Sequence, residues 1–582
     1  MLCVEPQGAQ NVLELLRKKE ILLESPCNGQ GLCGKCKIRI VSGEVHPLTP
    51  QEERFLTAEE RAQGVRLACL TVPRGSITLD PLGLLGEGQS DVLGGGDMPP
   101  FLFDPPVSGR EIRLEAPTLE QKRALCDGLN QEGPLPLSLL RKLPELMGKK
   151  PLEVVCREGQ PVDLRTDGCL YGLAVDIGTT TVAVNLIDLH TGQCIGEDGF
   201  INPQKAYGLD VLSRIHYDME HPGGVEELQK AIVQRLSQSA RQLTTQAGVP
   251  LDAVYEMTVG GNSTMLHSLL RVPLGSLGRA PYSSVFNRPI EVSARELGFP
   301  FSDAAQIYCI PSVSAYIGGD IVAGALAARL DTAEDTVLFL DIGTNGEMIL
   351  SRRGRMYACS CAAGPALEGM NISCGMRAEG GAVEHVSFAG GTAHLDVIGD
   401  QPPRGLCGSG ILETVSQGVA EGVISPSGRL SKESSLTDTD EKGKRRIVLD
   451  RERGLFVTQG DVRQVQLCKG AILSGILTLL RRLELKEEEV DRVVVGGQFG
   501  KHLDPASLTG AGLVPRCLEK KITYIGNSSM TGAKMCLLSQ EERLRAREIA
   551  RKISYVELSV SPGYERLFTQ CLRFESGQQA GI

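Results

Sequence analysis

Four cysteines near the N-terminus could together bind an inorganic iron–sulfur cluster. Cys27, Cys33 and Cys36 follow a Cys-x5-Cys-x2-Cys spacing, and Cys69 comes after 32 further residues. Cysteine thiolates are the usual protein ligands of such clusters. The stretch around the first three is rich in glycine, which lets the backbone turn tightly and direct N–H groups at the cluster sulfurs. The pattern therefore predicts a one-electron redox centre.

The arrangement of three close ligands and one distant ligand resembles that of [2Fe–2S] ferredoxins. The x5 gap is closer to the adrenodoxin-like spacing than to the plant-type x4. Zinc is an alternative, but zinc sites usually present two closely spaced pairs and this stretch has one. Disulfides are another alternative, but we expect no export signal in this chain of 18 cysteines. We interpret the cysteines outside the four as small buried side chains.

The elements that would position these ligands fall within residues 1–82, which we expect to form a β-grasp [2Fe–2S] ferredoxin domain. Residues 12–17 suit a short helix, residues 36–45 a strand, and residues 66–70 carry the fourth ligand. Only residues 1–5 precede the helix, so the usual opening hairpin is in doubt.

Two later segments share one design that suits phosphate binding. Each follows an apolar run and forms an Asp-Ile-Gly-Thr turn; the segments are Asp176-Ile-Gly178-Thr179-Thr180-Thr181 and Asp341-Ile-Gly343-Thr344-Asn345-Gly346. A tight turn directs backbone N–H groups and hydroxyls at one point, which favours phosphate oxygens. An aspartate at the strand end suits Mg²⁺, usually through water. The repetition predicts a duplicated fold whose halves face each other across a cleft.

A third segment ends a buried strand in glycines that permit close approach of a flat ligand. It contains Gly496, Gly497 and Gly500. Similar strand-to-glycine patterns occur at residues 257–263 and 525–528, and a lone pattern of this kind would be weak evidence.

The two loops and the third segment, in this order, resemble the acetate and sugar kinase/heat-shock chaperone/actin superfamily. The resemblance covers roughly residues 170–582 and implies that ATP and Mg²⁺ bind in the cleft. It implies that residues 176–181 and 341–346 flank the phosphates, with Asp176 and Asp341 as catalytic metal-side residues. Gly496, Gly497 and Gly500 would lie at the adenosine. We assign no general base, and Glu347 could be structural.

The sequence thus predicts an α/β multidomain protein. We expect a ferredoxin domain at 1–82, a flexible Gly- and Pro-rich linker at 83–109, a small α/β middle domain at 110–168 and an actin-like ATPase domain at 169–582. An ordered loop on the next domain is the alternative for the linker. Residues 458–485 predict a helix packed beneath the adenosine strand.

Composition limits the partners. The net charge of −10, the absence of Trp and an aromatic content of 4% argue against nucleic-acid binding. The apolar stretch 304–328 contains Pro311, Gly318, Gly319 and Asp320, so we expect a buried strand–loop–helix and no membrane segment. We expect a cytoplasmic protein.

A ferredoxin module joined to such an ATPase resembles, over the whole chain, the ATP-dependent reductive activators of corrinoid proteins. The stretches at residues 364–369, 372–378 and 406–410 look like further family signatures. The resemblance implies that the protein returns inactive Co(II) to Co(I) by one-electron transfer in a methyl-transfer system. It implies as partners a corrinoid protein of a methyltransferase system, an upstream low-potential electron donor and a second copy in a homodimer. Glu368, Ser373 and Arg377 are candidates for partner contact, or else core loop residues.

Three other functions stay open on the sequence alone. The first is an ATP-driven activator of another low-potential or radical enzyme. The second is a small-molecule kinase, which would leave the ferredoxin domain without a role. The third is a non-enzymatic, redox-sensing actin-like binding module.

Overall fold

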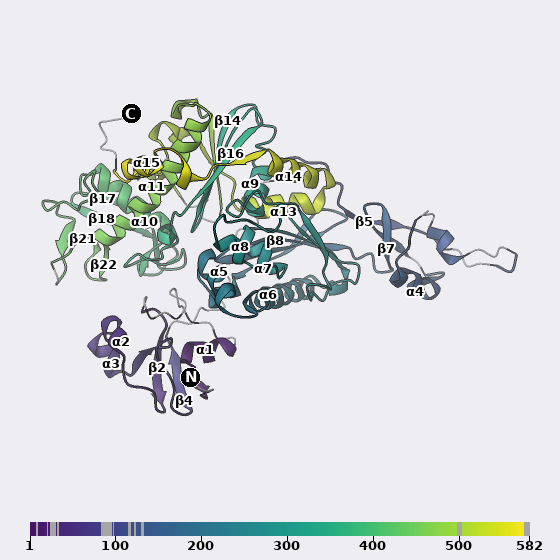
Figure 1. The fold of residues 1–582 in the computed structure, drawn as a ribbon, viewed down its shortest axis with the longest axis horizontal. Coiled ribbons are helices and arrows are strands. Elements are labelled where there is room, and N and C mark those ends of the chain that lie inside the picture. Colours follow the sequence, from purple (N-terminus) through teal and green to yellow (C-terminus); the bar gives the residue numbers. More distant parts are fainter. Residues whose placement is uncertain are drawn as a thin grey trace.

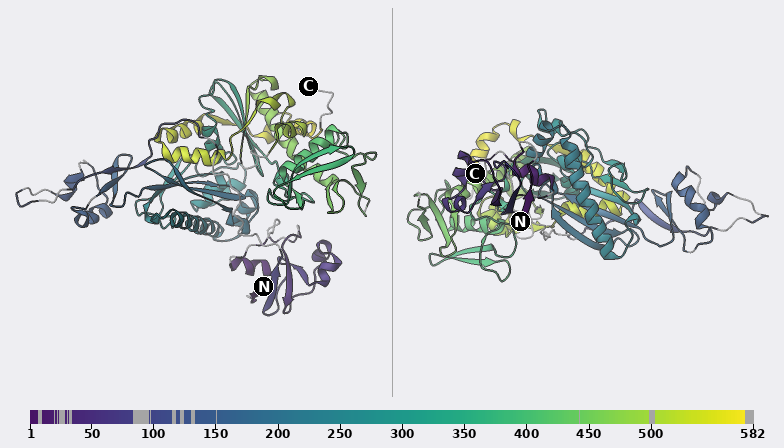
Figure 2. Two further views of the ribbon diagram at one scale, coloured as in Figure 1. Left: turned by 180° about the vertical axis from the view of Figure 1, so that it is seen from behind. Right: turned by 90° about the horizontal axis from the view of Figure 1, so that it is seen from below.

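The computed structural model shows a large body and two small modules (Figure 1). It describes residues 1–6, 10–19, 21, 23, 29, 31, 34–82, 96, 98–114, 118–120, 124–129, 133–149, 151–441, 443–497 and 503–574. The N-terminal module lies beside the large body, and the second module projects from one end of the long axis in all three views (Figure 2). The candidate residues therefore fall on two bodies, the N-terminal module and the large one.

The N-terminal module is a four-stranded antiparallel sheet, in the order β1-β4-β2-β3, with helix α1 packed on it. Its elements are β1 (Leu2–Val4), α1 (Val12–Lys18), β2 (Lys37–Ser42), α2 (Pro50–Phe55), α3 (Ala58–Ala62), β3 (Val65–Leu67) and β4 (Ile77–Pro81). Because β1 pairs directly with β4, the described part of the module has no opening hairpin.

The projecting module is a three-stranded antiparallel sheet, β5-β6-β7, covered by a short helix. Its elements are β5 (Val107–Glu111), η1 (Leu125–Leu129), α4 (Leu137–Leu146), β6 (Glu153–Arg157) and β7 (Gln160–Arg165). Glu256 of the large body forms buried ion pairs with Arg157 of this module and with Arg543. Arg157 also donates to the Tyr255 carbonyl at 2.8 Å, so the module is held to the large body.

Residues 98–106, here called the strap, are hydrogen bonded to the large body. The Asp104 N–H donates to the Leu538 carbonyl at 3.0 Å, and the Gln540 N–H donates to the Asp104 carbonyl at 2.9 Å. The Arg329 guanidinium donates to the Pro100 carbonyl at 2.6 Å.

The strap corrects the predicted flexible linker at 83–109. Its C-terminal part is the ordered loop of the alternative interpretation, and β5 already begins at Val107. The Gly- and Pro-rich composition of residues 83–109 is typical of a linker. The hydrogen-bond partners of Pro100 and Asp104, however, lie more than 200 residues later in the chain, so local sequence could not indicate them. Residues 83–95 and 97 of the predicted linker lie outside the described residues.

The first half of the large body is a six-stranded sheet in the order β10-β9-β8-β11-β13-β12. The strands are β8 (Tyr171–Ile177), β9 (Thr181–Asp188), β10 (Cys194–Ile201), β11 (Val254–Gly261), β12 (Ile290–Ser293) and β13 (Gln306–Cys309). The helices are η2 (Pro203–Ala206), α5 (Val211–Glu220), α6 (Gly224–Ala247), η3 (Leu251–Ala253), α7 (Ser263–Leu269), α8 (Gly275–Gly278) and α9 (Gly319–Ala327).

The second half is a six-stranded sheet in the order β24-β23-β14-β15-β16-β25. The strands are β14 (Thr336–Ile342), β15 (Gly346–Arg352), β16 (Arg355–Cys361), β23 (Arg492–Gly496), β24 (Ile522–Tyr524) and β25 (Ile553–Tyr555). The helices are η4 (Pro365–Glu368), α11 (Gln459–Arg482), η5 (Glu487–Glu489), α12 (Pro505–Gly510), η7 (Arg516–Lys521), α13 (Ser528–Leu538), α14 (Gln540–Lys552), η8 (Leu558–Val560) and α15 (Tyr564–Cys571).

An insertion between η4 and α11 adds a smaller lobe to the second half. It comprises β17 (Ala382–Ala389), β18 (Thr392–Val397), β19 (Gly405–Leu406), α10 (Gly408–Ala420), β20 (Thr437–Thr439), β21 (Arg445–Asp450) and β22 (Leu455–Thr458).

The two sheets repeat one topology. The orders β10-β9-β8-β11-β13 and β16-β15-β14-β23-β24 each have three antiparallel strands followed by two parallel ones. Helices α9 and α13 pack together between the halves, where a Cβ on Gly532 would lie 2.6 Å from the Ala323 Cα. This is the duplicated architecture that the repeated Asp-Ile-Gly-Thr turns predicted.

Two local predictions have clear outcomes. Residues 304–328 form β13, a loop and α9, as expected, and no described helix is long and apolar enough to cross a membrane. The helix predicted at 458–485 is α11, capped by Thr458, but it packs on β15 and β16 instead of beneath β23.

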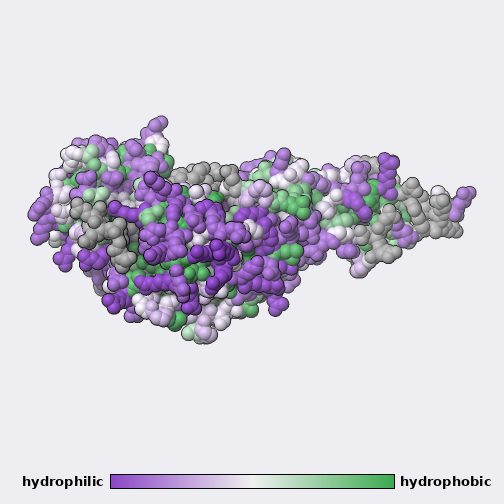
Figure 3. Space-filling model, turned by 90° about the horizontal axis from the view of Figure 1, so that it is seen from above, coloured by the Kyte–Doolittle hydropathy of each residue, from purple (hydrophilic) through white to green (hydrophobic). Residues whose placement is uncertain are grey.

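The face seen in Figure 3 is mostly hydrophilic, with hydrophobic residues in small areas.

Candidate functional site: a cysteine pair and a carboxylate-lined nucleotide cleft

Two of the four predicted cluster ligands meet in the N-terminal module. Cys36 immediately precedes β2 and Cys69 follows β3, and their sulfur atoms lie 3.3 Å apart. Both residues are buried, and the Ala68 N–H donates to the Cys36 carbonyl at 2.8 Å. The contact with the Cys69 thiol lowers the pKa of Cys36 to about 7, which favours the thiolate that a cluster requires. The pair is therefore suited to bind one iron atom of a cluster.

The backbone beside this pair adopts conformations that favour glycine. Gly31 and Gly34 have φ angles of +70° and +69°. A Cβ on Gly34 would lie only 2.8 Å from Phe55, so a side chain there would collide. These residues fit the expected tight loop around a cluster. Cys27 and Cys33 lie outside the described residues.

In the large body, Asp176 and Asp341 occupy equivalent positions in the two halves. Asp176 pairs with Gly260 at the end of β8, and Asp341 pairs with Gly496 at the end of β14. Both strands are almost continuously apolar because helices cover both faces of each sheet. The carboxyl ends of these strands carry the ligand-binding turns in open α/β sheets.

Asp176 is held by residues from the other half of the body. Ser529 donates to Asp176 Oδ1 at 2.7 Å, and Asn527 Nδ2 donates to Oδ2 at 2.9 Å. Both donors belong to the start of α13, which Asn527 caps. The two halves therefore meet directly at this carboxylate.

Two further carboxylates join Asp176 and Asp341. Asp320 lies in the first turn of α9 and Glu347 lies on β15. Burial, and then the nearby Asp341 and Asp176 carboxylates, raise the pKa of Asp320 to about 8. Burial followed by Asp176 raises the pKa of Asp341 to about 7, and burial with the Asp320 and Asp341 charges raises that of Glu347 well above its usual range. The four acids are therefore electrostatically coupled, although no three His, Cys, Asp or Glu side chains among the described residues lie close enough together to bind a metal ion directly.

Sequence reasoning missed Asp320 as a site residue. The signal available was the Gly318-Gly319-Asp320 run after β13, which matches the Gly526-Asn527 run after β24 in the duplicated half. Glu347, for which the sequence left a structural role open, is electrostatically coupled to Asp320 and Asp341 and accepts a hydrogen bond from Ser360 at 3.2 Å.

The cluster predicts a pH dependence of stability in the metal-free protein. An aspartate has a pKa near 3.9 when unfolded, and those of Asp341 and Asp320 are about 7 and about 8 in the folded protein. Between pH ~4 and ~8 the folded state binds more protons, so its stability falls as pH rises through this window. We expect Asp320→Asn to flatten this decline and to raise the melting temperature at pH 8 by a few degrees. Calorimetry at pH 5.5, 7 and 8 tests this, and an unchanged slope would contradict it.

Three polar side chains form hydrogen bonds with the first predicted phosphate loop. Asn202 Nδ2 donates to the Gly178 carbonyl at 2.8 Å, and Asn262 Nδ2 donates to Thr179 Oγ1 at 3.0 Å. The buried Arg214 guanidinium donates to the Thr179 carbonyl, and burial lowers the pKa of this arginine to about 9. The loop is therefore fixed without using the Thr180 hydroxyl.

The second predicted phosphate loop and the glycine segment lie side by side. A Cβ on Gly497 would stand 2.7 Å from Asp341 Oδ1, and Gly497 has a φ of +92°. The Gly343 N–H donates to the Asn345 carbonyl at 2.9 Å, which closes the turn before Gly346 begins β15. Glycine is thus required at 497 for close approach. Gly500 lies outside the described residues.

The three candidate partner-contact residues have different surroundings. Glu368 accepts hydrogen bonds from Thr344 and from Thr180, the latter at 3.3 Å, so it faces the cleft. Ser373 is bonded through its N–H to Asp461 Oδ1 at 2.9 Å, at the start of α11. Arg377 is exposed. Of the three, Glu368 therefore lies between the two predicted phosphate loops.

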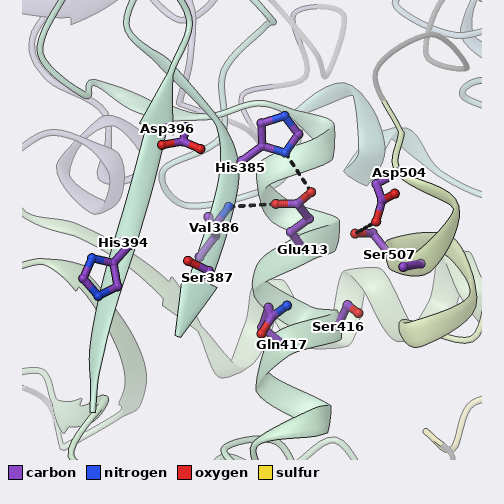
Figure 4. A pocket seen from close by; sticks show the side chains of 11 residues that line it. His385, Val386, Ser387, His394, Asp396, Glu413, Ser416, Gln417, Asp504 and Ser507 are labelled. Carbon is purple, nitrogen blue, oxygen red and sulfur yellow. Dashed lines mark hydrogen bonds and ion pairs between the residues drawn. The ribbon is translucent and has the colours of Figure 1, made fainter. Parts of the chain in front are cut away.

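A separate pocket of about 240 Å³ lies in the smaller lobe, between β17, β18, α10 and α12 (Figure 4). Glu413 in its wall accepts from the Val386 N–H at 2.7 Å and contacts His385 Nδ1 at 2.9 Å. Asp396 and Asp504 also line it. The lining thus combines three carboxylates with the imidazoles of His385 and His394, and Glu413 raises the pKa of His385.

The fold and the site define an actin-like ATPase that carries a [2Fe–2S] ferredoxin module. The model of the 2Fe-2S iron-sulfur cluster binding domain matches residues 2–74. The model of the RACo middle region matches residues 171–333, and that of the C-terminal domain of RACo, the ASKHA domain, matches residues 335–580. The RACo middle region thus covers the first half of the large body.

Similar proteins support the same grouping. Corrinoid activation enzyme RamQ of Eubacterium limosum is 32% identical over 409 residues, which cover 68% of this chain and 69% of that protein. The [Co(II) methylated amine-specific corrinoid protein] reductase of Methanosarcina barkeri is 25% identical, with 66% and 73% covered. A solved reductive activator for corrinoid, iron-sulfur protein superposes with a TM-score of 0.74 at 31% identity, covering 99% of this chain and 98% of that one. The chain belongs to the family of reductive activators of corrinoid proteins.

Proposed function

We propose that this protein uses ATP to return the cobalt of a corrinoid protein from inactive Co(II) to Co(I). The observation that carries the proposal is the presence in one chain of a buried cysteine pair and a duplicated α/β fold with Asp176 and Asp341 at the ends of equivalent strands. Likeness to a solved reductive activator over 99% of the chain supports it. When bound, the [2Fe–2S] cluster supplies a single electron, which passes to the partner's cobalt.

The need for ATP follows from the redox potentials. Ferredoxin-type [2Fe–2S] centres lie near −400 mV or above, and the family's cobalt couple lies lower. A gap of ~200 mV opposes the transfer of one electron by roughly 5 kcal/mol. Closure of the cleft around a nucleotide can offset this by changing the contacts with the corrinoid protein. In this proposal ATP hydrolysis then resets the complex.

Within the large body, we assign water-mediated Mg²⁺ binding to Asp176 and Asp341, because no three described carboxylates lie close enough together to bind the ion directly. Asp176 and Asp341 lie at the ends of equivalent strands and would face the ion, mostly through water. Asp320, at the start of α9, is the carboxylate that we expect to orient the attacking water. The predicted hydroxyl and glycine residues of both loops would surround the phosphates, and Gly497 would allow the nucleotide to approach Asp341.

The proposal also includes the partners expected from the sequence. A low-potential donor must reload the cluster after each transfer, because each turnover uses one electron. The corrinoid protein of a methyltransferase system would be the acceptor. We include a homodimer through the large body, which sedimentation of the purified protein can test.

The test mixes anaerobically reduced protein with a Co(II) corrinoid protein and records visible spectra with and without ATP–Mg²⁺. We expect the Co(I) band to grow only when nucleotide is present. Growth at the same rate without nucleotide would contradict an ATP-dependent reaction. Failure with several corrinoid proteins, while ATP is still hydrolysed, would favour another low-potential enzyme as the target.

A further inference from the structure

Glu368 connects the two predicted phosphate loops across the cleft. Its Oε2 accepts a hydrogen bond from Thr180 Oγ1 of the first loop at 3.3 Å, and its Oε1 accepts one from Thr344 Oγ1 of the second loop. Among the described residues, it is the only side chain that forms hydrogen bonds with both loops. These two hydroxyls belong to the segments expected to hold phosphate oxygens.

A carboxylate in this position is a chemical counterpart of a phosphoryl group. Both present anionic oxygens that accept hydrogen bonds from hydroxyl donors. Two such anions cannot share the same donors without a cation between them, because like charges at contact distance repel strongly. A phosphate bound by Thr180 and Thr344 would therefore have to displace Glu368.

We propose that Glu368 occupies the place of the terminal phosphate of a nucleoside triphosphate, and that it thereby sets the discrimination between tri- and diphosphate. The proposal rests on the proposed function, because it takes ATP as the ligand of the cleft. A triphosphate must compete with Glu368 for both threonines. A diphosphate lacks the terminal group and leaves the carboxylate in place.

If Glu368 is displaced, one short loop, residues 369–377, can transmit the movement to the protein surface. Glu368 ends η4, and the Gly364 N–H before η4 donates to the Thr344 carbonyl at 2.9 Å. After Gly369, which has a φ of +73°, the chain continues to Ser373, whose N–H donates to Asp461 of α11. It then reaches the exposed Arg377. Movement of Glu368 would thus change the conformation of a loop that is accessible to a partner protein.

The experiment measures the affinity of Glu368→Gln and wild type for ADP and for a non-hydrolysable ATP analogue, by calorimetry. We expect Glu368→Gln to bind the analogue about tenfold more tightly and to bind ADP within about twofold of wild type. Glu379→Gln is the matched control, because it removes the same charge from the exposed end of the same loop. It should leave both affinities unchanged.

A second measurement follows the loop itself. The rate of trypsin cleavage after Arg377 should differ between nucleotide-free and analogue-bound wild-type protein. Nucleotide-free Glu368→Ala should already be cleaved at the rate of the analogue-bound wild type. Unchanged affinities of Glu368→Gln combined with slower hydrolysis would overturn the proposal and make Glu368 a residue that orients water. A wild-type protein that binds no ATP would instead overturn the proposed function.

Discussion

Cys69→Ala is expected to abolish the visible absorbance of the cluster and all ATP-dependent formation of Co(I). Cys69 is buried with its sulfur 3.3 Å from that of Cys36, so its loss would leave the iron atom that the pair binds with one protein thiolate instead of two. Hydrolysis of ATP should persist at close to the wild-type rate, since the nucleotide cleft lies in the large body. Anaerobic spectra, iron and sulfide content, and phosphate release measure the three quantities.

Cys3→Ala is the matched control for this variant. Cys3 lies in the same module and is exposed, and its thiol contacts the Ser76 hydroxyl at 3.4 Å. Its loss should change neither the spectrum nor Co(I) formation. If Cys69→Ala kept a full [2Fe–2S] spectrum, the assignment of the fourth ligand would be wrong.

The sequence could predict the residues whose chemistry depends on the spacing of near neighbours in the chain. The cysteine pattern, the repeated Asp-Ile-Gly-Thr turns and the capped helix α11 each occupy a few consecutive residues. Asp176 and Asp341 end two apolar strands, and the repeated topology brings them to equivalent edges of two sheets. Local periodicity and turn chemistry suffice for such elements.

The missed features depend on contacts between distant segments. Glu368 meets Thr180 from 188 positions away, and Asn527 meets Asp176 from 351 positions away. No pattern around Glu368 distinguishes a cleft carboxylate from a loop residue. The strap was predicted to belong to a flexible linker for the same reason. The hydrogen bonds that fix it come from Arg329, Leu538 and Gln540, which are distant in sequence.

Asp341→Asn is expected to reduce ATP hydrolysis and ATP-dependent Co(I) formation by about 100-fold or more. A carboxylate that faces a metal ion contributes several kcal/mol to transition-state stabilisation, and each 1.4 kcal/mol corresponds to about tenfold in rate. The amide keeps the shape of the side chain but removes the charge that would balance Mg²⁺ in the proposed site. Phosphate release at saturating ATP and excess Mg²⁺ measures the effect, while the cluster spectrum should stay unchanged.

The same substitution should make the nucleotide-free protein more stable, which separates lost catalysis from unfolding. Burial and Asp176 raise the pKa of Asp341 to about 7, so its charge is unfavourable at pH 8 in the metal-free fold. Asp335→Asn, at the opposite end of β14 and paired with Arg492 at the surface, is the control and should affect neither hydrolysis nor melting by much. A lower melting temperature for Asp341→Asn would show that this carboxylate supports the fold and would remove the evidence for its role at the metal. A higher melting temperature with lost hydrolysis would show instead that the Asp341 carboxylate lowers the stability of the fold and is needed for hydrolysis.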